Sequence, residues 1–303
     1  MRARLRRLAL GAATLAGRRK GFFIPYRYAA SARLPDGGYP ALAPLFDARR
    51  PAFARVLADV DALGDALRGI GAAPPAFADL PPPAEAGFAK AGAKPLWLRA
   101  GRPPAPRWDQ GWFAPLDAAV AYTLVRTRKP SRIVEIGSGH STRFFARAVQ
   151  DGGLATQITA IDPAPRATLD GLPIAIIRAT AQDAGLAPFA ALRAGDFLSI
   201  DSSHVLMPGT DVDLFINRVW PMLPPGVVVH VHDIFLPDDY PPAWAWRGYN
   251  EQLAVAPLLH ANAIMFASRY VSTRMADDLA RSVVAKLPTA SDAQPASLWL
   301  VKS

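Results

Sequence analysis

Two short apolar runs in the second half of the chain end in residues that could transfer a proton or bind a metal. Asp201 and His204 follow the first run, and His232 and Asp233 close the second. A histidine oriented by an acid can serve as a general base, whereas two acids and a histidine can hold a divalent cation such as Mg²⁺ or Mn²⁺. The residue types indicate a reactive edge and leave both chemistries open.

These residues can meet only if the runs before them are strands of one sheet. Seven short runs rich in branched residues alternate with helical patterns, at residues 132–136, 157–161, 174–177, 197–200, 227–231, 263–266 and 298–301. That texture predicts a doubly wound, mostly parallel α/β sheet of about seven strands, with helices on both faces and an N-terminal helical extension. Ligands of such sheets bind beyond the carboxyl ends of the strands.

Composition and charge narrow the function classes. The 303 residues are 51% hydrophobic and include no cysteine, which excludes disulfides, thiolate metal sites and cysteine nucleophiles and favours a cytoplasmic protein. Nine basic residues precede the first acid, Asp36, and the rest of the chain holds 25 basic and 25 acidic residues. The body is therefore neutral, which argues against a nucleic-acid partner.

The basic leader, residues 1–35, contains an apolar stretch at residues 8–17. It is shorter than the roughly 20 residues that span a bilayer, and it runs into a basic triplet instead of a small-residue cleavage site. We predict a flexible segment or a weakly amphipathic surface helix. A solvated tail is favoured over contact with a membrane surface, which stays open.

Three segments follow from these patterns. After the leader, residues 36–107 form a helical extension, with one amphipathic helix over 51–71 and a Pro-rich linker over 73–94. Residues 108–303 form the main domain. Its first helix is predicted over 115–128, where Trp112 and Phe113 just before it either roof a ligand or pack in the core.

The stretch at residues 131–149 joins the first predicted strand to a helix through Gly137, Ser138 and Gly139. Glycines at this point permit positive φ angles and a close approach of a ligand, and the first N–H groups of the helix offer donors. The third glycine of the dinucleotide fingerprint is missing, and Glu135 stands at the strand end.

The second signal is Asp162, which ends the next strand 23 residues beyond Gly139. In dinucleotide-binding folds, the acid that binds the ribose hydroxyls follows the glycine turn by a similar number of residues, about 20. A carboxylate at Glu135 would repel a pyrophosphate and suit a cationic ligand. The two acids around a glycine turn therefore favour an adenosine ligand that carries positive charge and no phosphate.

These blocks resemble the class I S-adenosylmethionine-dependent methyltransferases. The resemblance runs over about the last 190 residues, through VEIGSGHST at 134–142, Asp162, SIDSSHV at 199–205 and PPGVVVHVHDIF at 224–235. The order of these blocks along the chain is similar to that in the methyltransferase 24 group. The resemblance implies a Rossmann-like fold and S-adenosylmethionine as the cofactor.

By that resemblance, a set of residues around the first turns would bind the cofactor. The methionine portion would lie against Glu135, Gly137 and Gly139, with further contacts from Ser138 and Ser141. The ribose hydroxyls would bind Asp162, and the adenine would lie near Gln182.

The resemblance also implies roles at the reactive edge. It suggests Asp201, His232 and Asp233 as ligands of Mg²⁺ or another divalent cation, although Ile234 replaces the acid or amide that usually follows. A metal-free enzyme would use His204 or His232 as the general base, oriented by Asp201 or Asp233.

An aromatic, Pro-rich segment at residues 236–255 follows the second run. Its rings, at Tyr240, Trp244, Trp246 and Tyr249, either form a lid over a ring-shaped acceptor or anchor the loop on the core.

The sequence thus predicts an O-methyltransferase that acts on a small hydroxylated acceptor, either a sugar or an aromatic unit. The alternative is a non-catalytic S-adenosylmethionine-binding or scaffold protein with a basic docking tail. A nicotinamide oxidoreductase is disfavoured by Glu135 and by the missing glycine. A homo-oligomer stays open.

Overall fold

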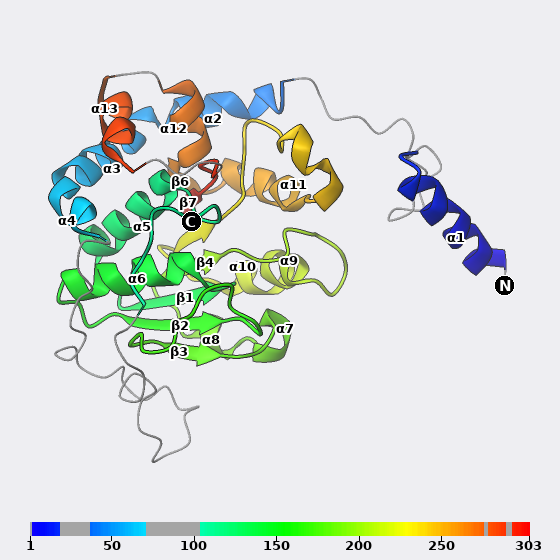
Figure 1. Cartoon of the computed structure of the whole chain (residues 1–303), viewed down its shortest axis with the longest axis horizontal. Coiled ribbons are helices and arrows are strands. Elements are labelled where there is room, and N and C mark those ends of the chain that lie inside the picture. The colour runs from blue at the N-terminus through cyan, green and yellow to red at the C-terminus, as the bar shows by residue number, and fades with distance from the viewer. Residues whose placement is uncertain (1, 19–36, 71–103, 276–277, 289–292) are drawn as a thin grey trace, which may run out of the picture.

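The computed structural model describes residues 2–18, 37–70, 104–275, 278–288 and 293–303. Its strands form one sheet in the order β3-β2-β1-β4-β5-β7-β6, in which only β7 runs antiparallel to its neighbours. The strands are β1 (Arg132–Ile136), β2 (Gln157–Ile161), β3 (Ala175–Ile177), β4 (Phe197–Ile200), β5 (Val228–Val231), β6 (Ala263–Ala267) and β7 (Leu298–Val301). The predicted doubly wound, mostly parallel sheet is confirmed (Figure 1).

The register of the central strands aligns the ends that matter for function. Ile136 of β1 pairs with Ile161 of β2 and with Ile200 of β4, and Ile200 in turn pairs with Val231 of β5. The next residue of each strand therefore stands at one edge of the sheet. These four residues are Gly137, Asp162, Asp201 and His232.

Helices cover the sheet and explain why its strands are apolar. β4 and β5 are buried along their whole length, as strands packed on both faces are. The main-domain helices and helical turns are α5 (Pro115–Arg128), α6 (His140–Asp151), α7 (Ala181–Ala184), α8 (Ala187–Ala190), α9 (Asp211–Leu214), η5 (Phe215–Val219), α10 (Trp220–Met222), η6 (Pro242–Arg247), α11 (Glu251–Val255), η7 (Ala256–His260), α12 (Ser268–Arg274) and α13 (Asp278–Lys286).

The N-terminal helices of the body pack against the same core. They are η2 (Pro40–Leu42), α2 (Ala43–Asp47), α3 (Arg50–Ala62) and α4 (Gly64–Gly69). On α3, Phe53 is fully buried, and its ring lies 5.8 Å from Phe266 of β6 and 5.7 Å from Tyr270 of α12. The helical extension and the sheet therefore share one hydrophobic core.

The prediction of one helix over residues 51–71 was wrong in one respect, because the structure has two helices there. The break falls at Leu63, whose backbone leaves the helical region at φ −95° and ψ 12°. Gly64 follows directly, and glycine is a poor residue for a helix interior because it loses more backbone freedom on folding. The Pro-rich segment at 73–94 lies outside the described residues.

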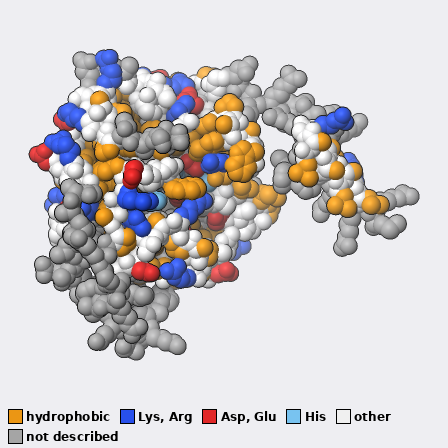
Figure 2. All heavy atoms as spheres, viewed as in Figure 1, with side chains coloured by type: hydrophobic (Ala, Val, Ile, Leu, Met, Phe, Trp, Pro, Cys, Tyr) orange, Lys and Arg blue, Asp and Glu red, His pale blue; other side chains and the backbone are white. Residues whose placement is uncertain are grey.

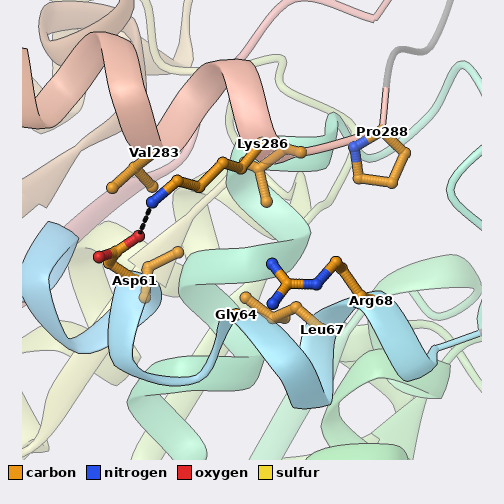
Figure 3. A pocket seen from close by; sticks show the side chains of 9 residues that line it. Asp61, Gly64, Leu67, Arg68, Val283, Lys286 and Pro288 are labelled. Atoms are coloured by element: carbon orange, nitrogen blue, oxygen red, sulfur yellow. Dashed lines mark hydrogen bonds and ion pairs between the residues drawn. The ribbon is translucent and has the colours of Figure 1, made fainter.

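A small cavity lies between α3, α4 and the end of α13 (Figure 3). Its volume is about 20 Å³, and the ion pair between Lys286 and Asp61, at 2.6 Å, lies at its wall. That volume is about enough for one water molecule. The cavity is therefore a packing gap between helices.

The leader contains a helix, α1 (Arg2–Leu15), as one of the two predicted forms has it. It lies apart from the body in Figure 1, and Leu5, Leu8 and Leu15 are exposed on it. None of the helices in the described part of the chain has the length and apolar character needed to cross a bilayer. On the face drawn in Figure 2, basic and acidic side chains of the body are interspersed.

Candidate active site

The turn after β1 brings the ends of two strands into contact. Gly137 has a φ of +74°, and a Cβ atom added there would lie 1.8 Å from the backbone oxygen of Asp201. The Gly137 N–H donates to the carbonyl of Ile161 at 3.1 Å. Only glycine fits this position, because a side chain would both strain the backbone and push β4 away from β1.

Asp162 fastens the end of β2 to this turn. Its Oδ2 atom accepts from the Ser138 N–H at 2.6 Å and from the Ser138 hydroxyl at 3.2 Å, and its Oδ1 atom accepts from the Ala164 N–H at 2.8 Å. The carboxylate therefore has a fixed orientation, and its Oδ1 atom retains a lone pair for a further donor.

Glu135 lies beneath the turn and is fully buried. Its two oxygens accept from the hydroxyls of Ser141 at 2.5 Å and Thr142 at 2.6 Å. Burial raises the pKa of Glu135 from its usual 4.5 to about 8, although both hydroxyl donors oppose that rise. Glu135 is thus largely uncharged at neutral pH, so its charge does not supply the repulsion of phosphate that the sequence interpretation assigned to it.

Replacing Glu135 with Gln should make the protein more stable in alkaline solution. The folded state keeps a proton that the unfolded chain releases above about pH 4.5, so the free energy of unfolding falls as pH rises from about 4.5 to about 8. That shift corresponds to roughly 5 kcal/mol at most. In thermal melts, the melting temperature of Glu135→Gln should rise progressively relative to that of the wild type between pH 5 and pH 8. The control is Asp170→Asn, at an exposed carboxylate 3.8 Å from Arg178. Parallel melting curves for Glu135→Gln and the wild type would contradict the expectation.

A cavity of about 510 Å³ opens at the ends of β1, β2 and β4, in the size range of small-molecule sites. Among the predicted cofactor residues, the structure places Gly137, Ser138, Asp162 and Gln182 in its wall, whereas Glu135, Gly139 and Ser141 lie behind the wall. The charged residues that line it are Asp162, Asp201, Asp211 and Arg166. Gln182 reaches across to donate to the carbonyl of Gly209 at 3.0 Å.

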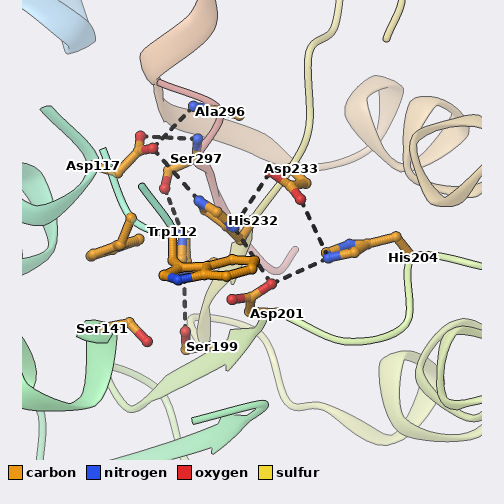
Figure 4. A network of polar contacts seen from close by, with 12 residues as sticks. Trp112, Asp117, Ser141, Ser199, Asp201, His204, His232, Asp233, Ala296 and Ser297 are labelled. Carbon is orange, nitrogen blue, oxygen red and sulfur yellow. Dashed lines mark hydrogen bonds and ion pairs between the residues drawn. The ribbon is translucent and has the colours of Figure 1, made fainter. Parts of the chain in front are cut away.

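The four residues predicted at the reactive edge converge beside this cavity (Figure 4). The His204 Nε2 atom lies 3.2 Å from Asp201 Oδ1 and 3.5 Å from Asp233 Oδ2. The His232 Nδ1 atom lies 3.5 Å from Asp201 Oδ1 and 3.6 Å from Asp233 Oδ1. His204 and Asp233 both adopt positive φ angles, of 59° and 54°, which is uncommon outside glycine and typical of constrained functional loops.

The charges in this cluster compensate one another. Burial alone would lower the pKa of both histidines, but the surrounding carboxylates hold the pKa of His204 and of His232 well above the usual value. Burial would likewise raise the pKa of Asp201, but the two histidines hold it far below its usual range. Two imidazolium rings thus balance the acids at the ends of β4 and β5.

His204 has a second acid behind its ring. Its Nδ1 atom lies 2.8 Å from Oε2 of Glu251, which is fully buried at the start of α11. The carbonyl of His204 accepts the backbone N–H groups of Asn250 and Glu251, at 3.0 and 3.2 Å. The loop after β4 and the start of α11 therefore hold this imidazole from both its ring and its backbone.

His232 is held differently. Its Nε2 atom faces Asp117 of α5 at 3.7 Å, and both of its ring nitrogens are buried without a hydrogen-bond partner among the described residues. The Asp117 carboxylate is itself fully buried and accepts the N–H groups of Ala296 and Ser297, each at 3.0 Å. His232 is thus a buried imidazole aimed between two acids.

His230 points to the same side of the sheet as His232 but has a structural role. Its ring nitrogens lie 2.8 Å from the hydroxyls of Ser199 and Ser297, and its ring stacks on Trp299 at 4.4 Å. Burial lowers the pKa of His230 to about 3, so the ring is neutral. It packs in the core and is not available for proton transfer.

The aromatic segment after β5 is partly anchored and partly exposed. Trp244 packs edge-on against Phe235 at 5.2 Å, and the ring of Tyr249 lies 4.6 Å from that of His204. Trp246, by contrast, is 82% exposed. The inner rings therefore anchor the segment on the core, and a lid role stays a prediction for Trp246.

The two aromatic residues before α5 also differ in burial. Phe113 is buried, and its ring lies 5.4 Å from the ring of His232. Trp112 is 55% exposed, and the guanidinium of Arg166 lies 4.7 Å from the centre of its ring. Because Arg166 lines the cavity, Trp112 contacts a residue of the cavity wall.

The sequence interpretation missed three residues that build this site. Thr142 occupies the position of the absent third glycine, and its hydroxyl accepts the Gly139 N–H at 2.9 Å while donating to Glu135. Asp117 and Glu251 stand behind the two histidines. Only Thr142 could have been found from local spacing, because Asp117 and Glu251 come from distant helices.

Comparison with known proteins gives one family match. Residues 134–234 match a family model described as a methyltransferase domain. That range begins in β1, includes the glycine turn and Asp162, and ends just beyond Asp233. No curated protein matches the chain.

Solved structures that resemble the chain include two O-methyltransferases and CmcI. The O-methyltransferase TomG from Streptomyces achromogenes, involved in tomaymycin synthesis and solved with SAM, is 14% identical, with a TM-score of 0.35, over 61% of this chain and 79% of its own. An O-methyltransferase from Bacillus cereus with SAH is 14% identical, with a TM-score of 0.35, over 65% and 84%. Apo CmcI is 17% identical, with a TM-score of 0.40, over 79% and 95%.

The match of the family model coincides with the glycine turn, the strand-end acids and the sheet order described above. Residues 134–234 thus match the methyltransferase domain family, and they lie within a doubly wound, Rossmann-like sheet of seven strands.

Proposed function

We propose that the protein transfers a methyl group from S-adenosylmethionine to a hydroxyl group of a small molecule. The observation that carries this proposal is the cluster of Asp201, His204, His232 and Asp233, which shares Asp201 with the wall of the cofactor-sized cavity. A hydroxyl needs help in losing its proton before it attacks a sulfonium methyl group, and acids with imidazoles supply that help. A sugar or a phenolic ring is the acceptor class we propose.

The cavity suits a cationic nucleoside without phosphate. Three acids and one arginine line it, so its charge is negative overall. In this proposal Asp162 accepts from the ribose hydroxyls, the turn at Gly137 and Ser138 meets the methionine portion, and Gln182 lies near the adenine. Glu135, Gly139 and Ser141 act from behind by fixing the shape of that turn.

Replacing Asp162 with Asn should weaken S-adenosylmethionine binding by about 10- to 100-fold. Hydrogen bonds from the ribose to a charged acceptor contribute roughly 1.5–3 kcal/mol, and the neutral amide also offers one acceptor oxygen fewer. Calorimetry with S-adenosylmethionine and S-adenosylhomocysteine measures the change. Asp170→Asn, on the segment that follows the same strand, should bind like the wild type. Unchanged affinity in Asp162→Asn would remove this residue from the cofactor site.

His204 is the proposed acceptor of the hydroxyl proton. Since Glu251 stands 2.8 Å from Nδ1, that nitrogen keeps its hydrogen when the ring is neutral. The resting imidazolium releases its Nε2 hydrogen before that nitrogen can accept the hydroxyl proton. Asp201 and Asp233 flank Nε2 and stabilise the imidazolium that forms. The ring is 2% exposed, so bulk water has little access to it.

The same edge also fits a divalent cation. Ligand atoms of Asp201, His204 and Asp233 lie within 4.8 Å of one another, and the buried ring of His232 has no hydrogen-bond partner in the described part of the chain. Asp201 and Asp233 would hold such a cation together with an imidazole, which is His204 by these separations and His232 by the sequence suggestion. Its chemistry would be to lower the pKa of an acceptor hydroxyl bound to it.

A direct assay tests the proposed function. The full chain is incubated with S-adenosylmethionine and a panel of sugars, catechols and other phenols, in the presence or absence of a chelator. The expected result is formation of S-adenosylhomocysteine together with a methyl ether on one acceptor class. If the protein binds the cofactor but methylates only amines or thiols, the hydroxyl proposal is wrong.

A further inference from the structure

Helix α5 carries a buried acid, Asp117, that no step of the proposed reaction uses directly. Asp117 is fully buried, although α5 lies outside the strand ends that form the reactive edge. Burying a carboxylate is costly unless its charge and lone pairs find partners. Asp117 has two backbone N–H donors, and the imidazole of His232 stands 3.7 Å from its Oδ2 atom.

We infer that Asp117 is a positioning residue for His232, and that it thereby gives the site a nitrogen ligand suited to a transition-series divalent cation in preference to Mg²⁺. This inference rests on the metal-assisted form of the proposed function. It concerns the orientation of one ring and the kind of cation that the ring favours.

Geometry provides the first step. The two N–H groups of Ala296 and Ser297 fix the Asp117 carboxylate in place, so the negative charge faces the Nε2 atom of His232. In the resting imidazolium both ring nitrogens carry a hydrogen that faces an acid. When a cation takes the place of the hydrogen on Nδ1, the Asp117 carboxylate keeps the hydrogen on Nε2. The lone pair of Nδ1 then points toward the acids on the opposite side of the ring.

The position of Nδ1 provides the second step. It lies 3.5 Å from Asp201 Oδ1 and 3.6 Å from Asp233 Oδ1, so it is within reach of a cation held by either carboxylate. Neither ring nitrogen has a hydrogen-bond partner among the residues that the structure describes, although His232 is only 5% exposed. A buried and unpartnered imidazole between two acids is the second, independent sign of a ligand at this acidic edge.

Ligand type provides the third step. Carboxylates alone suit Mg²⁺, whereas imidazole favours ions such as Co²⁺, Ni²⁺ and Zn²⁺. A ligating histidine commonly donates its other N–H to a carboxylate, and loss of that outer partner typically costs 10- to 100-fold in metal affinity. Asp117 stands where that outer partner is needed.

The experiment compares CoCl₂ with MgCl₂ on the full chain by calorimetry and by the visible absorption of bound Co²⁺. The wild type should bind Co²⁺ at least about 100-fold more tightly than Mg²⁺. His232→Asn should reduce that preference to about tenfold or less. Asp117→Asn should weaken Co²⁺ binding by about 10- to 100-fold and leave Mg²⁺ binding within about threefold.

Asp196→Asn is the matched control. Asp196 is also buried, and it accepts the backbone N–H groups of Arg132 and Arg193 at 2.8 and 2.9 Å, away from the reactive edge. A purely structural role of Asp117 would make both variants lose stability and keep the Co²⁺ preference. That outcome overturns the inference.

Histidine ¹⁵N NMR of the Zn²⁺-loaded wild type needs no variant to fold. It should show His232 bound through Nδ1 with hydrogen on Nε2. The opposite ring form, or ligation by His204 in its place, overturns the inference. A wild type that binds none of these cations also overturns it, whereas S-adenosylmethionine binding and chelator-resistant methyl transfer would then still support the proposed function.

Discussion

Replacing Gly137 with Ala is expected to destabilise the protein by about 3 kcal/mol or more and to abolish cofactor binding. The left-handed backbone at φ +74° alone costs an L-residue roughly 1–2 kcal/mol. The added Cβ would also stand 1.8 Å from the Asp201 carbonyl oxygen, which is backbone and cannot rotate away. The expected response is that β1 and β4 separate at the point where they form the cavity wall.

Gly195→Ala separates the two causes. Gly195 also has a positive φ, of +87°, but in the described part of the chain no atom lies within 4 Å of the place that a Cβ atom would take there. This variant should therefore show only the backbone cost, about 1–2 kcal/mol. Denaturant unfolding and calorimetry with S-adenosylmethionine measure both variants. If Gly137→Ala is no less stable than Gly195→Ala and still binds the cofactor, the contact between the two strand ends is not essential.

The fold could be predicted because its strands are locally distinctive. β1, β4 and β5 are short, mostly apolar runs, since helices cover both of their faces, and such runs need no knowledge of distant contacts to be found. The break between α3 and α4 was missed because helical spacing of apolar residues continues through Leu63 and Gly64, while the backbone at Leu63 turns. Periodicity reports which side chains face the core and is insensitive to one residue of altered backbone.

The reactive edge was predictable for a related reason. Asp201 and His232 each directly follow a strand, with Asp233 next in the chain, and parallel strands end at one edge. The acids behind the histidines were not predictable, because Glu251 reaches His204 from 47 residues away and Asp117 accepts from Ala296 and Ser297 about 180 residues away. Contacts of that span depend on how helices pack, which local spacing does not contain.

The burial of a side chain was the other property that the sequence could not supply. Glu135 was correctly singled out as the unusual residue of the glycine turn, yet its charge was inferred from its type. Full burial reverses that inference, since it raises the pKa of Glu135 to about 8. The acids that face the cavity, Asp162, Asp201 and Asp211, supply the negative charge in its place.

Replacing Asp201 with Asn should lower turnover by about 10³-fold while changing S-adenosylmethionine affinity by about threefold or less. Asn keeps the size of the side chain and removes the charge that faces His204 Nε2 at 3.2 Å and His232 Nδ1 at 3.5 Å. Both routes to a deprotonated hydroxyl depend on that charge, whether it stabilises an imidazolium or binds a cation. The affinity should hold because the Asp201 backbone, which meets the Gly137 turn, is unchanged.

Asp211→Asn is the matched control for this prediction. Asp211 is an acid of the same cavity wall, but its carboxylate accepts from the N–H and hydroxyl of Ser203 instead of facing the histidines of the reactive edge. Single-turnover rates and cofactor affinities of the two variants are to be compared with the same acceptor. A rate for Asp201→Asn close to that of Asp211→Asn would mean that the end of β4 only shapes the cavity. The protein would then bind the cofactor in this cavity and either activate its acceptor elsewhere or perform no methyl transfer. The other two acids of the cavity wall, Asp162 and Asp211, could not replace Asp201, because Asp201 is the one that faces both imidazoles.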